Sequence, residues 1–130
     1  MARLINRNIV LRSWPRCIYG SNEKIMTVEH LIPKYWLKYA DAPKEAYNDY
    51  IHLFPAGKYT NMIRGHHPVT EIVPPLHRGV IARSLMNMRS KYPDLDEIMD
   101  QVLPYKTYVN WLQYPMCYYE KQRYTIINTH

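Results

Sequence analysis

The chain has 130 residues, a length that fits a single domain with its own core. Its 17 Lys and Arg residues against 11 Asp and Glu give a net charge of +6 and a pI near 9.3, so it should attract anions, most commonly nucleic acid. The two cysteines, Cys17 and Cys117, exclude a cysteine-rich zinc module and argue against a disulfide framework, so we expect free thiols. Its apolar runs are too short for a membrane span of roughly 18 residues or for a signal peptide.

The first half of the chain has the pattern of a small β element. Residues 17–32 predict two extended pieces around a turn at residues 20–22. The aromatic and β-branched residues 49–54 predict a second strand, which we expect to end at Pro55 because proline cannot donate to a β-ladder. Residues 57–65 then predict a short helix.

The second half of the chain has a helical pattern. Residues 77–88 carry apolar side chains at helical spacing, and the prolines at 74–75 lie where a helix begins. Asp94 can cap a helix through Val102, Pro104 can open the next helix, and residues 116–127 predict another. We expect four apolar residues of the first of these helices in the core: Val80, Ile81, Leu85 and Met88. The predicted fold class is α+β, with a small antiparallel β element packed among several helices.

Glu29 and His30 form the most informative local feature. A carboxylate next to an imidazole, between β-formers and Pro33, is what a one-metal phosphodiesterase needs at its first active-site strand. The carboxylate would hold a hard cation, and the imidazole would take a proton from water. Taken alone, such a pair is more often solvated surface. Adjacent residues on an ideal strand also point to opposite faces, so the two share a site only if the strand bends or ends there.

Asn61, on the predicted short helix, is the partner that we expect for Glu29. An amide oxygen is a hard, neutral ligand that suits Mg²⁺ or Ca²⁺, although asparagine is also an ordinary residue at a helix start. One carboxylate and one amide leave net positive charge on the ion, which attracts a phosphodiester. His30 would act as the general base, because an ordinary histidine, with a pKa of about 6.5, can be neutral at physiological pH.

Three ordered blocks of the sequence resemble the bacterial endonuclease I family, whose members are nonspecific nucleases with a ββα-metal active site. The blocks are residues 28–33, then residues 49–56 with Asn61 and Arg64, then residues 74–75 with 78–83 and Met88. The last helix is also similar, at Trp111, Pro115, Glu120 and Arg123. The resemblance implies one nuclease-like domain over residues 1–130, with the ββα-metal motif at about 24–66 and a helical part at about 75–128.

The resemblance also implies the roles of the site residues. Glu29 and Asn61 would bind one Mg²⁺, with Mn²⁺ or Ca²⁺ as alternatives, and His30 would be the general base. The products would carry 5′-phosphate and 3′-hydroxyl ends. The family usually has asparagine where this chain has His52, which is either a core histidine or a second-shell residue that orients the site.

The arginine with which the family neutralises the scissile phosphate has no counterpart at its usual place, where this chain has only Lys34, Lys38 and Lys44. Arg64 and Arg78 are the best substitutes, because a guanidinium binds phosphate oxygens in a bidentate fork. We expect flanking phosphates to meet three further cations, Lys58, Arg83 and Arg89. The stretch 78–83 fits a solvated helix face as well as a phosphate clamp, and His66 and His67 are expected in a loop.

The sequence therefore predicts a Mg²⁺-dependent, sequence-nonspecific endonuclease that acts on DNA, with RNA as a second candidate. The alternative is a catalytically inactive nucleic-acid-binding or packaging module that kept the nuclease fold. The family's export signal and structural cysteines are missing, so we expect a minimal, intracellular or virus-encoded relative, in the host cytoplasm or the virion, with no membrane partner. An intracellular nuclease would need an inhibitor protein, a compartment or timing to protect the cell.

Overall fold

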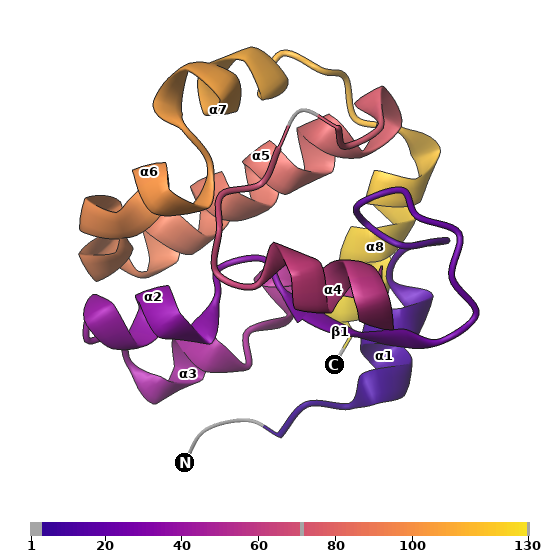
Figure 1. Cartoon of the computed structure of the whole chain (residues 1–130), viewed down its shortest axis with the longest axis horizontal. Helices are drawn as coiled ribbons and strands as arrows, with labels where there is room; N and C mark the ends of the chain where they lie inside the picture. Colours follow the sequence, from indigo (N-terminus) through magenta and orange to yellow (C-terminus); the bar gives the residue numbers. More distant parts are fainter. Residues whose placement is uncertain (1–3, 71, 130) are drawn as a thin grey trace.

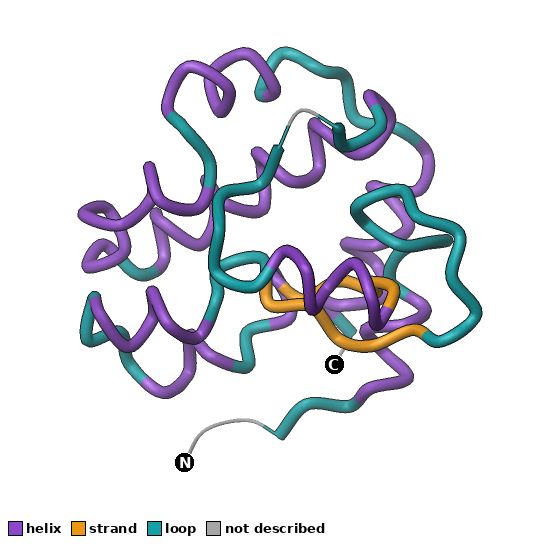
Figure 2. Tube along the Cα trace, viewed as in Figure 1, coloured by secondary structure: helices purple, strands orange, loops and turns teal. Residues whose placement is uncertain are grey.

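The computed structural model describes residues 4–70 and 72–129. Within this part of the chain the elements are, in order, α1 (Arg7–Arg12), β1 (Met26–His30), α2 (Lys34–Tyr39), α3 (Lys44–Tyr47), the 3-10 helix η1 (Tyr50–His52), β2 (Leu53–Gly57), α4 (Lys58–Arg64), α5 (Pro75–Lys91), the 3-10 helix η2 (Pro93–Ile98), α6 (Met99–Val102), α7 (Tyr105–Trp111) and α8 (Tyr118–Asn128). Helices surround a two-stranded antiparallel sheet, which confirms the predicted α+β class (Figure 1, Figure 2). None of the described helices is long and apolar enough to cross a membrane.

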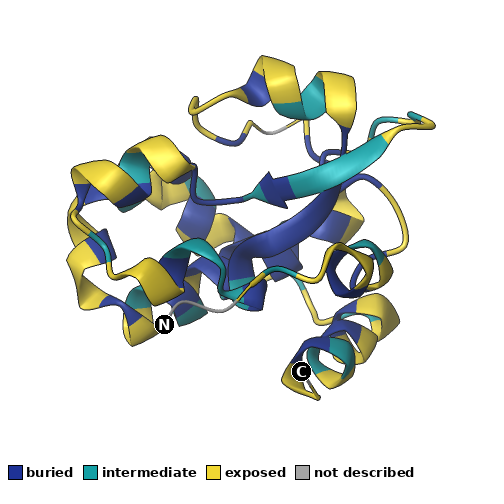
Figure 3. Ribbon diagram, turned by 90° about the horizontal axis from the view of Figure 1, so that it is seen from below, coloured by how far each residue is buried: buried dark blue, intermediate teal, exposed yellow. Residues whose placement is uncertain are grey.

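The sheet lies inside the molecule, and its two strands differ in burial. β2 is buried along its whole length, whereas β1 is mostly half-buried (Figure 3). The strands pair so that His30 lies opposite Leu53 and Glu29 opposite Phe54. β1 ends at His30, which meets the condition under which two adjacent side chains can serve one site.

The prediction of a strand over residues 49–54 that ends at Pro55 is wrong. Residues 50–52 form η1, which starts where the Asp49 side chain accepts a hydrogen bond from the backbone N–H of Ile51 (3.0 Å). The strand continues through Pro55 because the Pro55 carbonyl accepts a bond from the Ile18 N–H (2.9 Å) outside the two-stranded ladder. The nitrogen of Pro55 faces the same side as its carbonyl, away from β1. Its lack of an N–H therefore breaks no hydrogen bond of the ladder.

α4 follows β2 without a loop and packs on both strands (Figure 1). The predicted helix of residues 57–65 is thereby confirmed. Its first turn is capped by Glu23, whose carboxylate accepts bonds from the backbone N–H groups of Tyr59 (2.7 Å) and Thr60 (3.3 Å). This cap fixes the start of the helix that carries Asn61.

α5 is the central helix of the core. It confirms the predicted helix, begins at the predicted prolines and buries all four expected apolar residues: Val80, Ile81, Leu85 and Met88. A second, smaller apolar cluster joins α1, η1, β2 and α8 through Ile9, Val10, Tyr50, Leu53 and Ile127. The sheet thus lies between two apolar clusters, and its position is fixed from both sides.

The remaining helices agree with the sequence in part. α7 begins after Pro104 and α8 covers most of residues 116–127, as predicted. The single helix expected from Asp94 to Val102 is instead η2 followed by α6, and neither N-cap residue, Tyr92 or Ile98, makes a side-chain capping bond. Leu95 and Ile98, both buried, are three residues apart, a spacing that fits a 3-10 turn. Cys17 and Cys117 are free thiols, as expected.

Candidate active site

A shallow cleft of about 360 Å³ lies where the end of β1, the start of α2 and α4 meet. Six of its lining residues bear on function: Glu29 and His30 from β1, Lys34 and Tyr35 from α2, Asn61 from α4, and His66 after α4. The three residues expected to form the metal and base site therefore line one cleft, although they come from two separate elements. We call this site the cleft.

Glu29 is buried, with 5 % of the residue exposed. Its oxygen Oε2 accepts hydrogen bonds from the Tyr19 hydroxyl (2.6 Å) and from Nη1 of Arg64 (3.3 Å). Burial raises the pKa of Glu29, and the Arg64 charge and the Tyr19 hydroxyl act in the opposite direction. Both side-chain contacts fall on Oε2, and the backbone N–H of His30 also bonds the carboxylate. A carboxylate oxygen has two lone pairs, so Oε1 can still bind a cation.

Arg64 joins the end of α4 to the end of β1 and is nearly buried. Besides Glu29, its guanidinium donates to the Tyr19 hydroxyl (2.9 Å), to the Leu31 carbonyl (3.0 Å) and to the His67 carbonyl (2.7 Å). All three guanidinium nitrogens already donate to protein acceptors. This position does not suit the predicted role on the scissile phosphate, and it makes Arg64 a support for Glu29 instead.

His30 borders the cleft while its ring packs inward. Burial, and then the charge of Lys34, lower the pKa of His30 to about 4, while an interaction with the backbone of Tyr47 acts in the opposite direction. The ring is therefore neutral at neutral pH. Its Nε2 is buried and has no hydrogen-bond partner among the described residues. Such an unpaired buried nitrogen costs about 1–3 kcal/mol, and functional sites are where this cost is typically retained.

His52 is fully buried behind His30. Its Nε2 lies 2.8 Å from the Ala46 carbonyl, and its Nδ1 accepts a bond from the Ile32 N–H (3.3 Å), so Nε2 carries the proton. Burial lowers the pKa of His52 to about 3, which keeps the ring neutral. Its edge packs against the His30 ring, with centroids 5.6 Å apart. His52 is thus a core histidine that also contacts the candidate base.

Asn61 is held against β1 by its amide nitrogen. Nδ2 donates to the Thr27 hydroxyl (2.9 Å) and to the Val28 carbonyl (3.3 Å). Because a carbonyl only accepts, these bonds fix the amide orientation and leave the Asn61 oxygen for another partner.

The donors at the cleft fit a hard cation better than a soft one. In the described part of the chain, no three His, Cys, Asp or Glu side chains gather at a metal-binding distance, so zinc-type ligation is not formed there. A carboxylate oxygen of Glu29 and the amide oxygen of Asn61 suit Mg²⁺, which is often held by one or two protein ligands and keeps several waters.

Arg78 and Arg83 lie in the helical part and do not line the cleft. Arg78 donates to the Val73 carbonyl (3.0 Å) and to the Tyr114 hydroxyl (3.1 Å), and its guanidinium packs 5.5 Å from the Trp111 ring centroid. Arg83 forms a bidentate ion pair with Glu120, with both N–O distances 2.7 Å. These contacts give both arginines packing roles and do not favour the predicted phosphate contacts.

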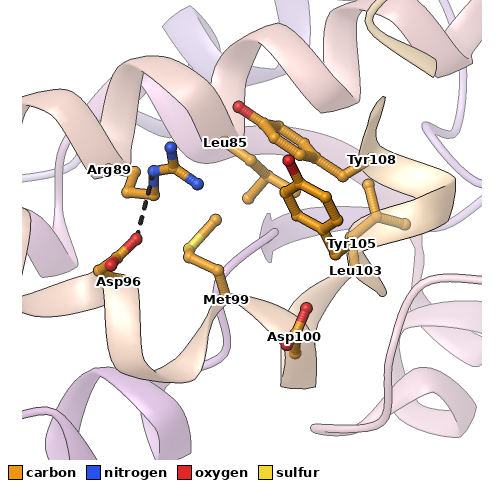
Figure 4. A pocket seen from close by; sticks show the side chains of 8 residues that line it. All are labelled: Leu85, Arg89, Asp96, Met99, Asp100, Leu103, Tyr105 and Tyr108. Carbon is orange, nitrogen blue, oxygen red and sulfur yellow. Dashed lines mark ion pairs between the residues drawn. The ribbon is translucent and has the colours of Figure 1, made fainter. Parts of the chain in front are cut away.

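Arg89 and Lys58 also lie outside the cleft. Arg89 lines a separate cavity of about 220 Å³ between α5, η2, α6 and α7, where Figure 4 shows it facing Asp96 (3.4 Å). The carboxylates of Asp96 and Asp100 at this cavity oppose an approaching phosphate. Lys58 is exposed at the start of α4, and its contact with a flanking phosphate stays a prediction.

From the sequence, two residues of the site had no predicted role there: Tyr19, which was not singled out, and Lys34, which was named only as one of three lysines at the place of the family's arginine. Tyr19 binds Glu29 and lies in a turn closed by the Gly20 N–H and the Cys17 carbonyl (2.9 Å). The predictions of a first extended piece that begins at Cys17 and of a turn at residues 20–22 are therefore wrong. Lys34 lies at the cleft, close enough to lower the pKa of His30. Its signal was its place directly after Pro33, where α2 begins.

No family model, curated protein or solved structure matches the chain. The function is therefore inferred from the cleft and its chemistry.

Proposed function

We propose that the protein is a Mg²⁺-dependent, sequence-nonspecific endonuclease of DNA whose active site is the cleft. The observation that carries this proposal is the convergence of Glu29, His30 and Asn61 on one cleft at the end of β1. RNA is a second candidate substrate, because both polymers carry the phosphodiester on which this chemistry acts. The products would carry 5′-phosphate ends, as the sequence resemblance to endonuclease I implies.

His30 would accept the proton of the attacking water. Its pKa of about 4 leaves nearly every ring in the proton-accepting form at neutral pH, although it also makes the ring a weaker base. Nε2 is the atom that we assign to this step, since no hydrogen bond to a described residue has to break before it takes the proton. The buried His52 ring holds the His30 ring from behind.

Glu29, through Oε1, and Asn61, through its amide oxygen, would hold the metal ion. When bound, Mg²⁺ supplies Lewis-acid stabilisation of the charge that develops on the phosphate and on the leaving oxygen. Lys34, exposed at the cleft, is the cation that we assign to the phosphate in place of Arg64. Lysine is a point charge, so it orients phosphate less strictly than a bidentate guanidinium would.

The proposal is tested by nicking of supercoiled plasmid at low salt, where phosphate contacts are strongest. Wild type is compared with His30→Ala, and with Lys121→Ala on the exposed face of α8 as a control, in Mg²⁺ and in EDTA. We expect nicking only with Mg²⁺, a loss of about 10²–10⁴-fold in His30→Ala and no change in the control. Nicking by His30→Ala at the wild-type rate, or nicking that persists in EDTA, would contradict the proposal.

A second candidate is a nucleic-acid-binding module without turnover. Two observations favour it: Oε2 of Glu29 is engaged by Arg64 and Tyr19, and Nε2 of His30 is shielded from solvent. Either feature would block hydrolysis if Oε2 of Glu29 stays engaged and Nε2 of His30 stays shielded when nucleic acid binds. This candidate predicts a DNA gel shift by wild type together with no Mg²⁺-dependent nicking.

A further inference from the structure

Aromatic rings are stacked at the rim of the cleft. The Tyr35 ring lies on the His66 ring with centroids 4.4 Å apart and planes within 18°, and the His66 ring lies on that of His67 at 5.4 Å and 23°. Tyr35 and His66 both line the cleft. We call Tyr35, His66 and His67 the rim stack.

The rim stack is held in place by its neighbours. The Trp36 indole N–H donates to the His66 carbonyl (2.9 Å), and the Tyr35 and Trp36 rings form a T-shaped pair, with centroids 4.8 Å apart and planes at 89°. Arg64, which supports Glu29, also donates to the His67 carbonyl (2.7 Å). The stack is therefore tied both to the start of α2 and to the residue that supports the candidate metal ligand.

The rim stack is exposed to solvent, and packing in the hydrophobic clusters does not explain its position. Tyr35 is 54 % exposed, and neither of the two hydrophobic clusters includes it. His66 and His67 are also exposed. Lys34, which we assign to the phosphate, is the residue next to Tyr35. An exposed aromatic face and a phosphate-binding cation thus lie side by side at one edge of the cleft.

We propose that the rim stack binds an unpaired nucleobase next to the phosphate held in the cleft, so that the substrate is single-stranded or locally unpaired nucleic acid. This inference rests on the proposed function for the phosphate in the cleft. Within a duplex both faces of a base are covered by its neighbours, whereas an unpaired base offers a free face that can stack on an aromatic ring. Because every base has such a face, the stack selects unpaired bases without selecting sequence.

Binding in EDTA tests the inference without cleavage. The probe is a short fluorescein-labelled oligo-dT strand, and its affinity for wild type, Tyr35→Ala and Tyr35→Phe is measured by fluorescence anisotropy. Tyr118→Ala is the matched control, since Tyr118 is similarly exposed in the first turn of a helix but lies outside the cleft. Two further probes, an abasic strand of equal length and a blunt duplex, separate base contacts from phosphate contacts.

We expect Tyr35→Ala to lose roughly five- to a hundredfold in affinity for oligo-dT, the effect of one lost base–aromatic stack. Tyr35→Phe keeps the ring and should keep the affinity, and Tyr118→Ala should bind like wild type. All variants should bind the abasic strand and the duplex equally. Wild-type affinity of Tyr35→Ala for oligo-dT, an equal loss on the abasic strand, or no binding of oligo-dT by wild type would overturn the inference.

The two proposals fail in different ways. A wild type that binds oligo-dT through Tyr35 but never nicks DNA refutes the nuclease and keeps the stack as a base-binding site. A wild type that nicks DNA while Tyr35→Ala binds oligo-dT normally refutes the stack alone.

Discussion

Two buried carboxylates, Glu29 beside the cleft and Glu120 between α5 and α8, each pair with an arginine but differ in how completely they are bonded. Both oxygens of Glu120 bond Arg83 at 2.7 Å, and Oε2 also accepts from the Tyr124 hydroxyl (3.1 Å). Among the described residues, the side-chain partners of Glu29 bond Oε2 alone, and the nearest Arg64 nitrogen is 3.3 Å away. The first pair is closed, whereas the second leaves an oxygen beside a cleft.

This difference distinguishes a buried ion pair that only stabilises the fold from one that can also bind a ligand. A closed ion pair whose bonds are all made inside the protein has nothing left with which to bind a ligand, so its loss should affect stability alone. In the Glu29 pair, Oε1 has no side-chain partner among the described residues, and Nε2 of the neighbouring His30 has no hydrogen-bond partner there, so both atoms can still bind a ligand. Substitutions at the two glutamates test whether the Glu29 pair serves catalysis and the Glu120 pair serves stability alone.

The largest effect is expected for Glu29→Gln. Glutamine keeps the shape and an acceptor for Tyr19 and Arg64, but it removes the charge that would hold the metal. Nicking should fall about a thousandfold, which corresponds to about 4 kcal/mol of transition-state stabilisation. The change also leaves the buried Arg64 without its charged partner, so the free energy of unfolding should fall as well, and nicking is compared per folded molecule. Plasmid nicking and urea unfolding of the same preparation measure both quantities; unchanged nicking would contradict the metal-ligand role.

For Glu120→Gln we expect a loss of stability without a loss of nicking. The change leaves Arg83 half-buried without its charged partner, so the free energy of unfolding should fall by about 3 kcal/mol. Nicking per folded molecule should stay at the wild-type level. Glu97→Gln, at an exposed position, is the control for loss of one negative charge. A nicking defect in Glu120→Gln below its unfolding temperature would erase the contrast between the two pairs.

The two histidines beside the cleft predict how stability depends on pH. Burial lowers the pKa of His30 to about 4 and that of His52 to about 3, below the ordinary value of about 6.5. Both rings then take up protons on unfolding as the pH falls through about 6.5, so the unfolding free energy should fall by about 2 kcal/mol between about pH 7 and about pH 5.5.

Urea unfolding across this pH range measures the effect of the histidines. The raised pKa of Glu29 acts in the opposite sense, because the folded chain then binds the proton more tightly than the unfolded chain does. The Glu29→Gln background removes this opposing effect, and His77, whose pKa burial also lowers, adds to the effect of the two rings. A stability that stays flat over this range would show that the two rings are not buried in neutral form.

The smallest effect is expected for Glu23→Gln, which acts on the cleft through α4. Hydrogen bonds from Ser21 and Thr60 lower the pKa of Glu23 to about 2, and the carboxylate also caps the first turn of α4. Loss of the charge should loosen the turn before Asn61 and weaken Mg²⁺ binding roughly two- to fivefold. Calorimetric titration with Mg²⁺ measures it, and Glu45→Gln on the exposed face of α3 is the control. An unchanged affinity would show that Glu23 does not position Asn61.

The sequence predicted the parts of the molecule whose signal is local. The 3.6-residue spacing of Val80, Ile81, Leu85 and Met88 identified α5 and its buried face. The short helix predicted over residues 57–65 is α4, and the second extended piece predicted within residues 17–32 contains β1.

The parts that the sequence did not predict depend on contacts between distant segments. Arg64 was expected on a phosphate, but its acceptors come from Tyr19, Glu29 and Leu31, which only the folded chain brings to it. Pro55 was expected to end its strand, because the sequence does not show that the Pro55 nitrogen faces away from the partner strand. In both cases the chemistry of the residue was interpreted correctly, but its neighbours in the fold were not predicted.

The most direct test of the central claim is chemical rescue of His30→Gly. The change removes the proposed base and leaves a cavity of the size of its ring, which free imidazole can enter. If His30 is the base, His30→Gly should nick plasmid very slowly in Mg²⁺, and added imidazole should restore part of the rate, whereas Glu29→Gln should not respond. A His30→Gly protein that nicks at the wild-type rate without imidazole would contradict the account.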